Sequence, residues 1–323
     1  MRHTTVDMGL SRLWSEGGDA AGFCLIAGTT ASGKSALALA LAEATGGVVV
    51  NADSVQLYRS LPILTARPGP AELARAEHRL YGVLDDGETS SVARWLELAA
   101  AAIRAVQPRL AIVTGGTGFY LEALLDGLVD VPATPPDLRA AAEARFEALG
   151  RAAFAGELAA RDPVLAARGL PVDRQRLVRA WEVLELTGRS IASFGAADRR
   201  RPALPPWRGG VALIPPPAVT AARIERRFDA MLAAGVVAEV AAWRRRPEAA
   251  RSPLAKADGV TELAAYLDGR VGLAEARRAT IVKVRRYAKR QRTWLRHRLG
   301  GLAKLEATGE AVAAARGEPA GVR

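Results

Sequence analysis

The chain has 323 residues, half of them hydrophobic, and carries a formal net charge of +11. This length exceeds a usual single domain and favours one large core with an inserted or appended unit, while the positive excess favours a polyanionic partner. Cys24 is the only cysteine, which excludes an intrachain disulfide and favours a reducing, cytoplasmic location. Three scattered histidines exclude a histidine zinc site, and no run reaches the ~18 apolar residues of a membrane span. Residues 1–21 carry acidic side chains and lack a long apolar stretch, so we expect a loose leader and not a signal peptide.

The first predicted element is a buried strand at residues 23–27, followed by a complete phosphate-binding loop at residues 28–35. The loop reads Gly-Thr-Thr-Ala-Ser-Gly-Lys-Ser and fits G-x-x-x-x-G-K-[ST], and the Ala/Leu-rich segment after it predicts a helix. A strand, a glycine loop and a helix N-terminus together direct several backbone N–H groups at one anion. The lysine adds a positive charge, and Ser35 offers a hydroxyl to Mg²⁺, the one cofactor that the loop predicts. The loop therefore predicts a polyphosphate ligand without specifying which one.

A second strand is predicted at residues 47–51, and Asp53 follows it closely. The carboxyl ends of parallel strands form the ligand crevice of such sheets, so Asp53 is expected near the phosphate loop. Two readings of its carboxylate stay open. It accepts a proton or reaches a metal through water, or it caps a short helix that begins at Ser54.

A helix is predicted at residues 92–106 and a third strand at 110–114, and this alternation predicts a parallel sheet covered on both faces. Ordinary P-loop ATPases place a metal-holding aspartate at the end of such a strand, whereas residues 115–120 here read Gly-Gly-Thr-Gly-Phe-Tyr. Asp85 and Asp86 lie in a turn-like Asp-Asp-Gly and are expected to be loop residues. A motor or signalling NTPase is therefore poorly equipped. We expect the loop to hold a phosphate-bearing substrate whose γ-phosphate is not hydrolysed.

The rest of the chain divides at two proline-rich stretches, residues 131–136 and 199–206. Between them the composition predicts consecutive helices, and strand character returns at 210–215 before a helical stretch to about residue 298. We expect an α/β fold: a P-loop NTPase-like parallel sheet with an inserted all-helical subdomain and a helical C-terminal region. The expected boundaries are 22–132 and 207–300 for the catalytic core, 133–206 for the insert, and 301–323 for a tail of marginal helix or disorder.

Residues 276–298 contain ten Lys/Arg and no Asp or Glu. Apolar residues recur there at three-to-four spacing, so one helix face is expected to pack and the other to meet phosphates. The absence of acidic residues favours nucleic-acid contact over a merely solvated face. Two further groups of arginines are expected by default to lie on solvated or ion-paired surface, although one of the second group could reach a diphosphate: Arg176 with Arg179, and Arg223 with Arg226 and Arg227.

Together these segments resemble the bacterial tRNA dimethylallyltransferases, which prenylate the adenosine next to the anticodon. They run in family order over nearly the whole chain, and those around Asp53 and before Trp294 are far more specific than the widely shared phosphate loop. The sequence departs from the family pattern at Thr29, Leu64 and Val260, where the family has Pro, Gly and Tyr. The matching segments are Gly28–Ser35, Asn51–Tyr58, Thr65–Pro68, Gly115–Tyr120, Gln175–Arg179, Arg223–Phe228 and Arg286–Trp294.

The resemblance implies transfer of a dimethylallyl group from dimethylallyl diphosphate to the exocyclic N6 amine of that adenosine, with release of diphosphate. It implies three catalytic residues, Asp53, Thr30 and Arg223, with Asp53 as the base for a weakly nucleophilic amine and Arg223 bracing the diphosphate. The target base must leave its stack to reach the donor. The diphosphate is assigned to Gly28, Thr29, Thr30, Ala31, Ser32, Gly33, Lys34 and Ser35, with Ser35 also as the metal ligand. The tRNA anticodon stem-loop, gripped by the helical insert, is assigned to Asp53, Ser54, Val55, Gln56, Thr117, Arg139, Gln175, Arg176, Leu177, Val178, Arg179, Val284, Arg285, Arg286, Tyr287, Ala288, Lys289, Arg290 and Gln291.

Three other readings stay open: a prenyltransferase acting on free adenine nucleotides, a small-molecule P-loop kinase, and a non-enzymatic nucleic-acid-binding ATPase. The helical insert and the basic C-terminal helix are superfluous for a small substrate, and the missing strand-end aspartate disfavours an ATPase. The chain is expected to act as a monomer, without an obligate protein partner and away from membranes.

Overall fold

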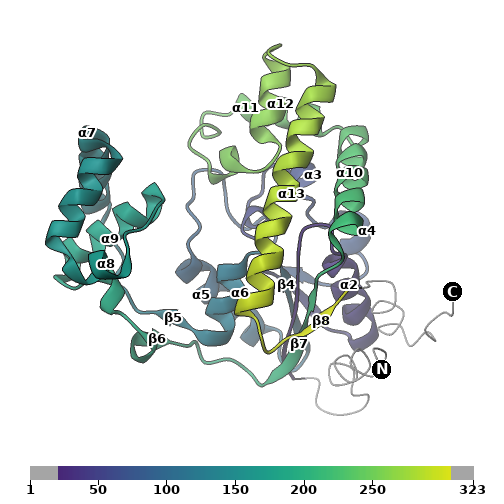
Figure 1. Cartoon of the computed structure of the whole chain (residues 1–323). Coiled ribbons are helices and arrows are strands. Elements are labelled where there is room, and N and C mark those ends of the chain that lie inside the picture. The colour runs from purple at the N-terminus through teal and green to yellow at the C-terminus, as the bar shows by residue number, and fades with distance from the viewer. Residues whose placement is uncertain (1–20, 307–323) are drawn as a thin grey trace. The chain divides into compact units, whose positions relative to one another are not determined.

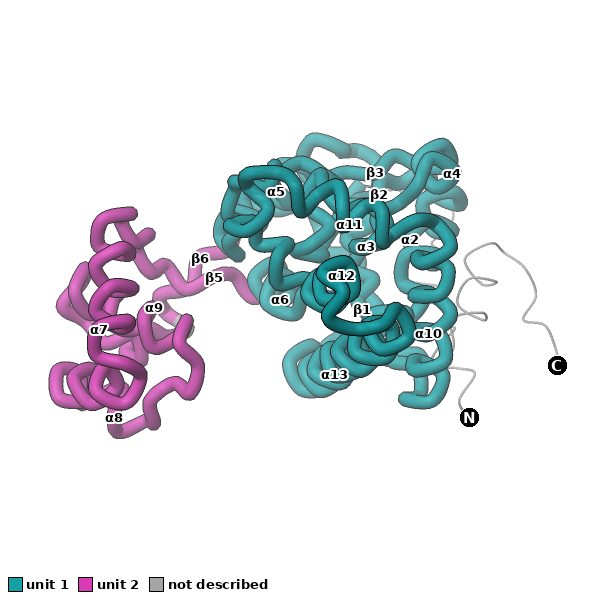
Figure 2. The backbone as a smooth tube through the Cα atoms, turned by 90° about the horizontal axis from the view of Figure 1, so that it is seen from above, with its two compact units in different colours: residues 1–125, 202–323 teal, residues 126–201 magenta. Residues whose placement is uncertain are grey.

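The computed structural model describes residues 21–306. The described residues form two compact units, one combining residues 21–125 with residues 202–306 and the other formed by residues 126–201 (Figure 2). The second unit thus interrupts the first in sequence. Its limits lie a few residues before those expected for the helical insert, 133–206, because the short strands at its two ends pair with each other and belong to it.

A six-stranded parallel sheet forms the centre of the first unit, in the order β3-β2-β4-β1-β7-β8. Figure 1 labels β4, β7 and β8 of this sheet. Its central strands β1 and β4 are buried along their whole length, which fits their apolar sequences because a parallel sheet is covered on both faces. Helix α2, Lys34–Thr45, packs on one face, where Leu37 and Leu41 join a core cluster with Ile26 and Ile112. The strands are β1 Gly22–Gly28, β2 Val48–Asn51, β3 His78–Arg79, β4 Leu110–Gly115, β7 Trp207–Leu213 and β8 Ala303–Leu305.

The expectation of a marginal helix or disorder after Gly300 is wrong for residues 303–305. They form β8, which pairs in parallel with β7 from Val211↔Ala303 to Leu213↔Leu305. A strand of three residues is too short for hydrophobic periodicity to reveal, and the buried Leu305 stabilises it only once β7 lies beside it. The remainder of the tail, and residues 1–20 of the expected leader, lie outside the described residues.

Helices surround this sheet and carry most of the remaining residues of the first unit. A long helix, α13, runs over Leu273–Arg298, somewhat longer than the basic segment that predicted it. Its neighbours in the fold are α10 and α12, and α11 packs in turn against α12. The other elements of this unit are η1 Val55–Leu57, α3 Pro62–Thr65, α4 Pro70–Leu73, α5 Val92–Ala105, α6 Gly118–Asp126, α10 Pro217–Ala233, α11 Val236–Arg244, η4 Pro253–Lys256 and α12 Val260–Leu267.

The second unit consists of three helices above a pair of two-residue antiparallel strands, β5 Leu128–Val129 and β6 Arg199–Arg200. Its helices are α7 Pro136–Arg161, α8 Pro163–Arg168 and α9 Arg174–Thr187, followed by the 3₁₀ turns η2 Ile191–Ser193 and η3 Ala196–Asp198. They enclose an aromatic core of their own, in which Phe146 meets Phe154 edge-on at 5.2 Å between ring centroids. The unit therefore buries an apolar cluster without help from the sheet.

Three glycines at the end of β4 allow other segments to approach closely. A Cβ on Gly115 would lie 2.1 Å from the carbonyl oxygen of Ala52, and one on Gly116 would lie 2.3 Å from Nε2 of Gln291. A Cβ on Gly118 would lie 2.5 Å from the Trp294 ring. The Gly-Gly-Thr-Gly segment is therefore required by the packing of α13 and of the segment after β2 against the end of β4.

Candidate active site

The phosphate loop lies between β1 and α2 and has the geometry of an anion cradle. Ala31 (φ 57°) and Gly33 (φ 92°) adopt left-handed backbone conformations, which turn successive N–H groups toward one side. The N–H groups of Ala31, Gly33, Lys34 and Ser35 have no acceptor within the described part of the chain. Together with the N-terminus of α2, they offer several donors to one bound anion.

Two adjoining cavities open from this loop. The first, of ≈400 Å³, is lined by residues 31–35 with Ala66, Arg223 and Arg227. The second, of ≈330 Å³, continues past Asp53 to an apolar wall. Because Lys34, Ser35 and Arg227 line both, the phosphate-binding and apolar spaces meet at these three residues.

Two cations lose hydration where the cavities meet. Burial lowers the pKa of Lys34 to about 8, and the nearby Asp53 carboxylate partly opposes that shift. Burial also lowers the pKa of Arg227, again against the attraction of Asp53. An anion bound at this point would replace the lost hydration of both cations, which makes the site selective for negative charge.

Arg227 is a residue that the sequence reading named without assigning it to the site. Arg223, which was assigned, donates to the carbonyl oxygen of Ser32 at 3.1 Å and lines only the first cavity. The two arginines lie four residues apart on α10, so they share one helix face. That spacing was the signal for Arg227: an arginine one turn beyond the assigned one points the same way.

Asp53 lines the second cavity, and its position is compatible with both interpretations of its carboxylate. Its Oδ1 accepts the N–H of Val55 at 3.2 Å, a capping-type bond made one residue before Ser54, which is the N-cap position of η1. Its Oδ2 has no hydrogen-bond partner among the described residues and is available to accept a proton. Capping therefore fixes the carboxylate without using up its basic oxygen.

A network behind Asp53 sets its position, and the sequence reading missed most of it. The side chain of Asn51 accepts the N–H of Asp53 at 2.8 Å and donates to the carbonyl oxygens of Asp53 and Leu80 at 2.9 and 3.0 Å. The main-chain oxygen of Asn51 accepts the indole N–H of Trp95 at 2.9 Å. Thr117, assigned to tRNA, accepts the N–H of Ser54 at 3.0 Å. These bonds connect the end of β2 and the residues after it with the loop after β3, with α5 and with the segment after β4.

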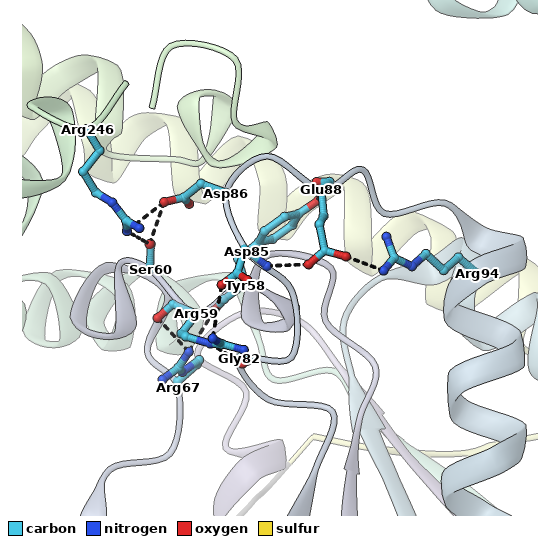
Figure 3. Close-up of polar contacts among 10 residues, drawn as sticks. All are labelled: Tyr58, Arg59, Ser60, Arg67, Gly82, Asp85, Asp86, Glu88, Arg94 and Arg246. Atoms are coloured by element: carbon cyan, nitrogen blue, oxygen red, sulfur yellow. Dashed lines mark hydrogen bonds and ion pairs between the residues drawn. The ribbon is translucent and has the colours of Figure 1, made fainter. Parts of the chain in front are cut away.

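Side-chain hydrogen bonds and ion pairs fix the position of the segment that follows Asp53, and Figure 3 shows those around Ser60 and Asp86. Asp86, 3% exposed, accepts from Ser60 at 2.8 Å and from Arg246 at 2.9 Å, which links this segment to the chain after α11. Asp86 is thus a loop residue as expected, with a structural ion pair. Glu239 accepts the N–H groups of Ile63 and Leu64 at the start of α3.

The second cavity has an apolar wall and a polar end. Leu64, a departure from the family pattern, is part of the wall and lies where a Cβ on Gly259 would come within 2.9 Å of its Cδ1. At the polar end, burial raises the pKa of Asp258 and of Tyr287. The wall is formed by Leu64, Ile224, Phe228, Met231, Ile281 and Val284, and the polar end by Lys256, Asp258, Thr280, Tyr287 and Arg290. A space with cations at its mouth and an apolar wall suits a small apolar group attached to a phosphorylated head.

Half of the ten cations in residues 276–298 are already engaged by other parts of the first unit. The helix has no acidic residue in this stretch, but α6, α10 and the start of α12 bring carboxylates to it, which a count along the sequence cannot detect. Arg277 pairs with Asp229, Lys283 with Glu262, Arg285 with Glu225 and Arg298 with Glu122, while Arg292 donates to the carbonyl oxygen of Pro215. The others are exposed and form no ion pair within residues 21–306; we call Arg278, Arg286, Lys289, Arg290 and Arg296 the unpaired cations of α13.

The remaining α13 residues assigned to tRNA differ in placement. Val284 and Tyr287 line the second cavity, and Ala288 is buried. Gln291 is buried too, with its amide bonded to Thr30 and Gly116. Of the residues near Asp53, Ser54, Val55 and Gln56 line the cavity, and Gln56 also donates to the carbonyl oxygens of Thr65 and Ala66.

In the second unit, the residues assigned to tRNA also fall into ion-paired, buried and exposed side chains. Glu182, only 3% exposed, accepts from Thr134 and is paired with Arg139 at 3.4 Å and Arg179 at 3.2 Å. Leu177 and Val178 belong to the core of the unit. Gln175 and Arg176 are exposed, so they are the side chains of this group most open to a ligand.

Metal binding would have to rely on few side chains. No group of three or more His, Cys, Asp and Glu that could hold a metal ion occurs in residues 21–306. The Ser35 hydroxyl lines both cavities, which suits a cation shared with bound phosphate oxygens. The same described residues contain no helix with the length and apolar character needed to cross a membrane.

Comparison with known proteins agrees with this geometry. Residues 56–298 match the family model for IPP transferase. A tRNA dimethylallyltransferase from Methylocella silvestris is 49% identical over 286 residues, covering 87% of this chain and 94% of the relative. Another, from Phenylobacterium zucineum, is 48% identical and covers 88% and 92% of the two chains.

Solved structures show the same relationship. A tRNA isopentenylpyrophosphate transferase from Bacillus halodurans superposes with a TM-score of 0.63 at 30% identity, covering 92% of this chain and 94% of that one. A eukaryotic dimethylallyltransferase described as acting on tRNA superposes with a TM-score of 0.75 at 26% identity, covering 89% and 74%. With the family model spanning most of its length, the chain belongs to the IPP transferase family.

Proposed function

We propose that this protein transfers a dimethylallyl group from dimethylallyl diphosphate to the exocyclic N6 amine of the adenosine adjacent to the anticodon of tRNA, releasing diphosphate. The observation that carries the proposal is the junction of the two cavities: Lys34, Ser35 and Arg227 border both the anion cradle and the space that contains Asp53. One ligand can therefore place its diphosphate in the loop and its apolar group against the wall. The relatives named tRNA dimethylallyltransferase support the choice of donor and acceptor.

In this mechanism the loop binds the leaving group. The N–H groups of Ala31, Gly33, Lys34 and Ser35 and the Lys34 ammonium contact diphosphate oxygens, and Arg223 and Arg227 brace them from α10. Charge develops on the diphosphate as the allylic C–O bond breaks, and donors already fixed in the fold stabilise it without reorganising. Thr30 lines the second cavity, the space proposed for the apolar group of the donor.

Asp53 serves the nucleophile. The N6 lone pair is delocalised into the adenine ring, so the N–C bond forms only with difficulty unless its proton is removed as well. Oδ2 of Asp53 accepts that proton, while the Val55 N–H holds Oδ1 and the Asn51 side chain holds the main chain of Asp53. The adenine reaches this depth only after leaving its stack in the anticodon loop.

A magnesium ion fits the same site. Ser35 offers its hydroxyl toward the space that the diphosphate would occupy, and a hydroxyl plus phosphate oxygens is a typical magnesium environment. When bound, the ion would neutralise part of the leaving group's charge.

We assign tRNA binding to the unpaired cations of α13 and to the exposed Gln175 and Arg176 of the second unit, with Arg139 at its edge. Phosphate contacts of this kind position an RNA without reading its sequence. A monomeric enzyme and a cytoplasmic location remain part of the proposal, and a tRNA substrate is consistent with that location.

The test is transfer of label. Donor labelled in the prenyl group, or ATP labelled in its γ-phosphate, is incubated with tRNA that has adenosine after the anticodon, with the same tRNA carrying guanosine there, and with AMP. We expect label from the prenyl donor in the first tRNA alone and no consumption of ATP. Equal labelling of AMP would instead support an enzyme for free nucleotides, and stoichiometric ADP would support a kinase.

A further inference from the structure

One buried amide links the basic helix to the phosphate loop. Gln291 of α13 is 6% exposed, and its Oε1 accepts the N–H of Thr30 at 2.7 Å. Its Nε2 donates to the carbonyl oxygen of Gly116 at 2.9 Å. The three residues come from α13, the loop after β1 and the end of β4, so a single side chain joins three elements.

We propose that Gln291 is a positioning residue of the donor site and that its side chain does not contact RNA. Its neighbours Lys289 and Arg290 are exposed, whereas the Gln291 amide faces inward and is bonded on both sides. Gly116 is required for this contact, because a Cβ there would lie 2.3 Å from Nε2. This inference rests on the proposed function only in its choice of donor.

The bond to Thr30 changes which loop amides meet the diphosphate. The N–H of Thr30 points to Gln291 and that of Ser32 to the carbonyl oxygen of Thr29 at 3.2 Å, so neither is available to an anion. The N–H groups of Ala31, Gly33, Lys34 and Ser35 remain. Gln291 thereby holds the start of the loop against β4 and leaves the later amides converging on the cradle.

Two substitutions in the same helix separate this role from RNA binding. Gln291→Met keeps the length and apolar bulk of the side chain but makes neither hydrogen bond. We expect it to weaken binding of dimethylallyl diphosphate, measured by calorimetry without tRNA, by about tenfold, and to leave tRNA affinity within about twofold. The matched variant Lys289→Met should do the reverse, because its ammonium group is exposed and unpaired.

A third variant, Gln291→Glu, gives a pH-dependent readout. A protonated glutamic acid is isosteric with glutamine: its carbonyl accepts from Thr30 and its hydroxyl donates to Gly116. An ionised carboxylate loses the second bond and repels both the Gly116 carbonyl and the diphosphate. Since burial raises a carboxyl pKa, donor affinity of Gln291→Glu should approach that of the wild-type protein near pH 5.5 and fall below it as pH rises toward 8.

The outcomes distinguish the possible failures. If wild-type protein neither binds the donor nor transfers its prenyl label to tRNA, the proposed function is wrong. If wild-type protein binds it and Gln291→Met binds it equally well, or if the affinity ratio of Gln291→Glu to wild type is independent of pH, the positioning role is overturned. A Gln291→Met variant that loses tRNA affinity and keeps donor affinity would return the residue to the RNA-contacting surface.

Discussion

The cations beside the phosphate loop and the unpaired cations of α13 are both proposed sites for phosphate, yet their surroundings differ. Lys34 and Arg227 have lost hydration, which lowers the pKa of each, and Asp53 is the carboxylate that opposes this shift for both. The unpaired cations of α13 are exposed and keep their hydration. The difference teaches that positive charge alone does not define a binding site: partly dehydrated cations suit the small anion proposed for the loop, and exposed cations suit the long polyanion proposed for α13.

Replacing Asp53, the carboxylate near both Lys34 and Arg227, should have the largest effect on turnover. Asp53→Asn keeps an oxygen for the Val55 N–H, so the start of η1 should survive. It cannot accept a proton, and turnover should fall by ~10²–10⁴-fold if general-base catalysis is its main role. Single-turnover kinetics at saturating donor and tRNA measure this. A folded variant that binds both substrates and reacts at a near wild-type rate would reduce Asp53 to a cap.

Removing the half-buried Arg227 cation should have the next largest effect, on donor affinity. Arg227→Met is expected to weaken donor binding by roughly 10–100-fold, because a charge-assisted hydrogen bond contributes about 1.5–3 kcal/mol. Arg226→Met is the control, since Arg226 is exposed on the next position of the same helix. Calorimetric titration with dimethylallyl diphosphate decides the matter. Equal losses in the two variants would mean that the effect is general electrostatics and not a specific contact.

The lowered pKa of Lys34 predicts pH dependence. As pH rises above about 8, the free enzyme loses this proton and donor binding must restore it, so affinity should fall by up to about tenfold per pH unit. For folding the sign is opposite. Between about 8 and the usual value of 10.5 the unfolded chain binds more protons, so this residue makes stability rise with pH.

Both trends are measurable against Lys34→Met, which should show neither. Donor titrations in buffers of different ionisation enthalpy should reveal proton uptake by the wild-type protein near pH 8.5, and thermal unfolding across the same range reports the stability trend. Proton uptake that persists in Lys34→Met would assign the titration to another group.

Substitutions among the unpaired cations of α13 should have the smallest effect on affinity for tRNA and the clearest effect on its salt dependence. Neutralising Arg286 and Lys289 together should make the slope of log affinity for tRNA against log salt shallower by about 1.4–1.8, if each contacts one phosphate. Neutralising Arg277 and Arg285 should change it little, because Asp229 and Glu225 already pair with them. Equal slopes for the two double variants would show that pairing in the fold does not decide which cations meet RNA.

Several elements could be predicted because their causes are local. The conformation of the loop at residues 28–35 could be predicted because its glycines, its lysine and the flanking strand and helix are consecutive in sequence. Asp53 could be placed near it because parallel strands end at one edge of the sheet. Strand β8 could not be predicted, because three residues acquire their conformation only from pairing with β7.

The site shows the same division. The spacing from Arg223 indicates that Arg227 shares its helix face, but only the fold shows that Arg227 borders both cavities. Asn51 acts on Asp53 through a side chain and a carbonyl that also bond to Leu80 and Trp95. The glycines after β4 could be recognised as a motif. They are required because Gln291 and Trp294, which lie far along the chain, approach the backbone there.

The sequence by itself determined the phosphate loop, the α/β class of the core and the family resemblance, because each rests on residues close together or on ordered segments. Only the tertiary structure decided which cations are paired, which arginine borders both cavities and which polar side chain holds the loop. The physical reason is that hydration, ion pairing and hydrogen bonding depend on distances in space. The main-chain nitrogen of Thr30 and Oε1 of Gln291 come within 2.7 Å only when the chain has folded.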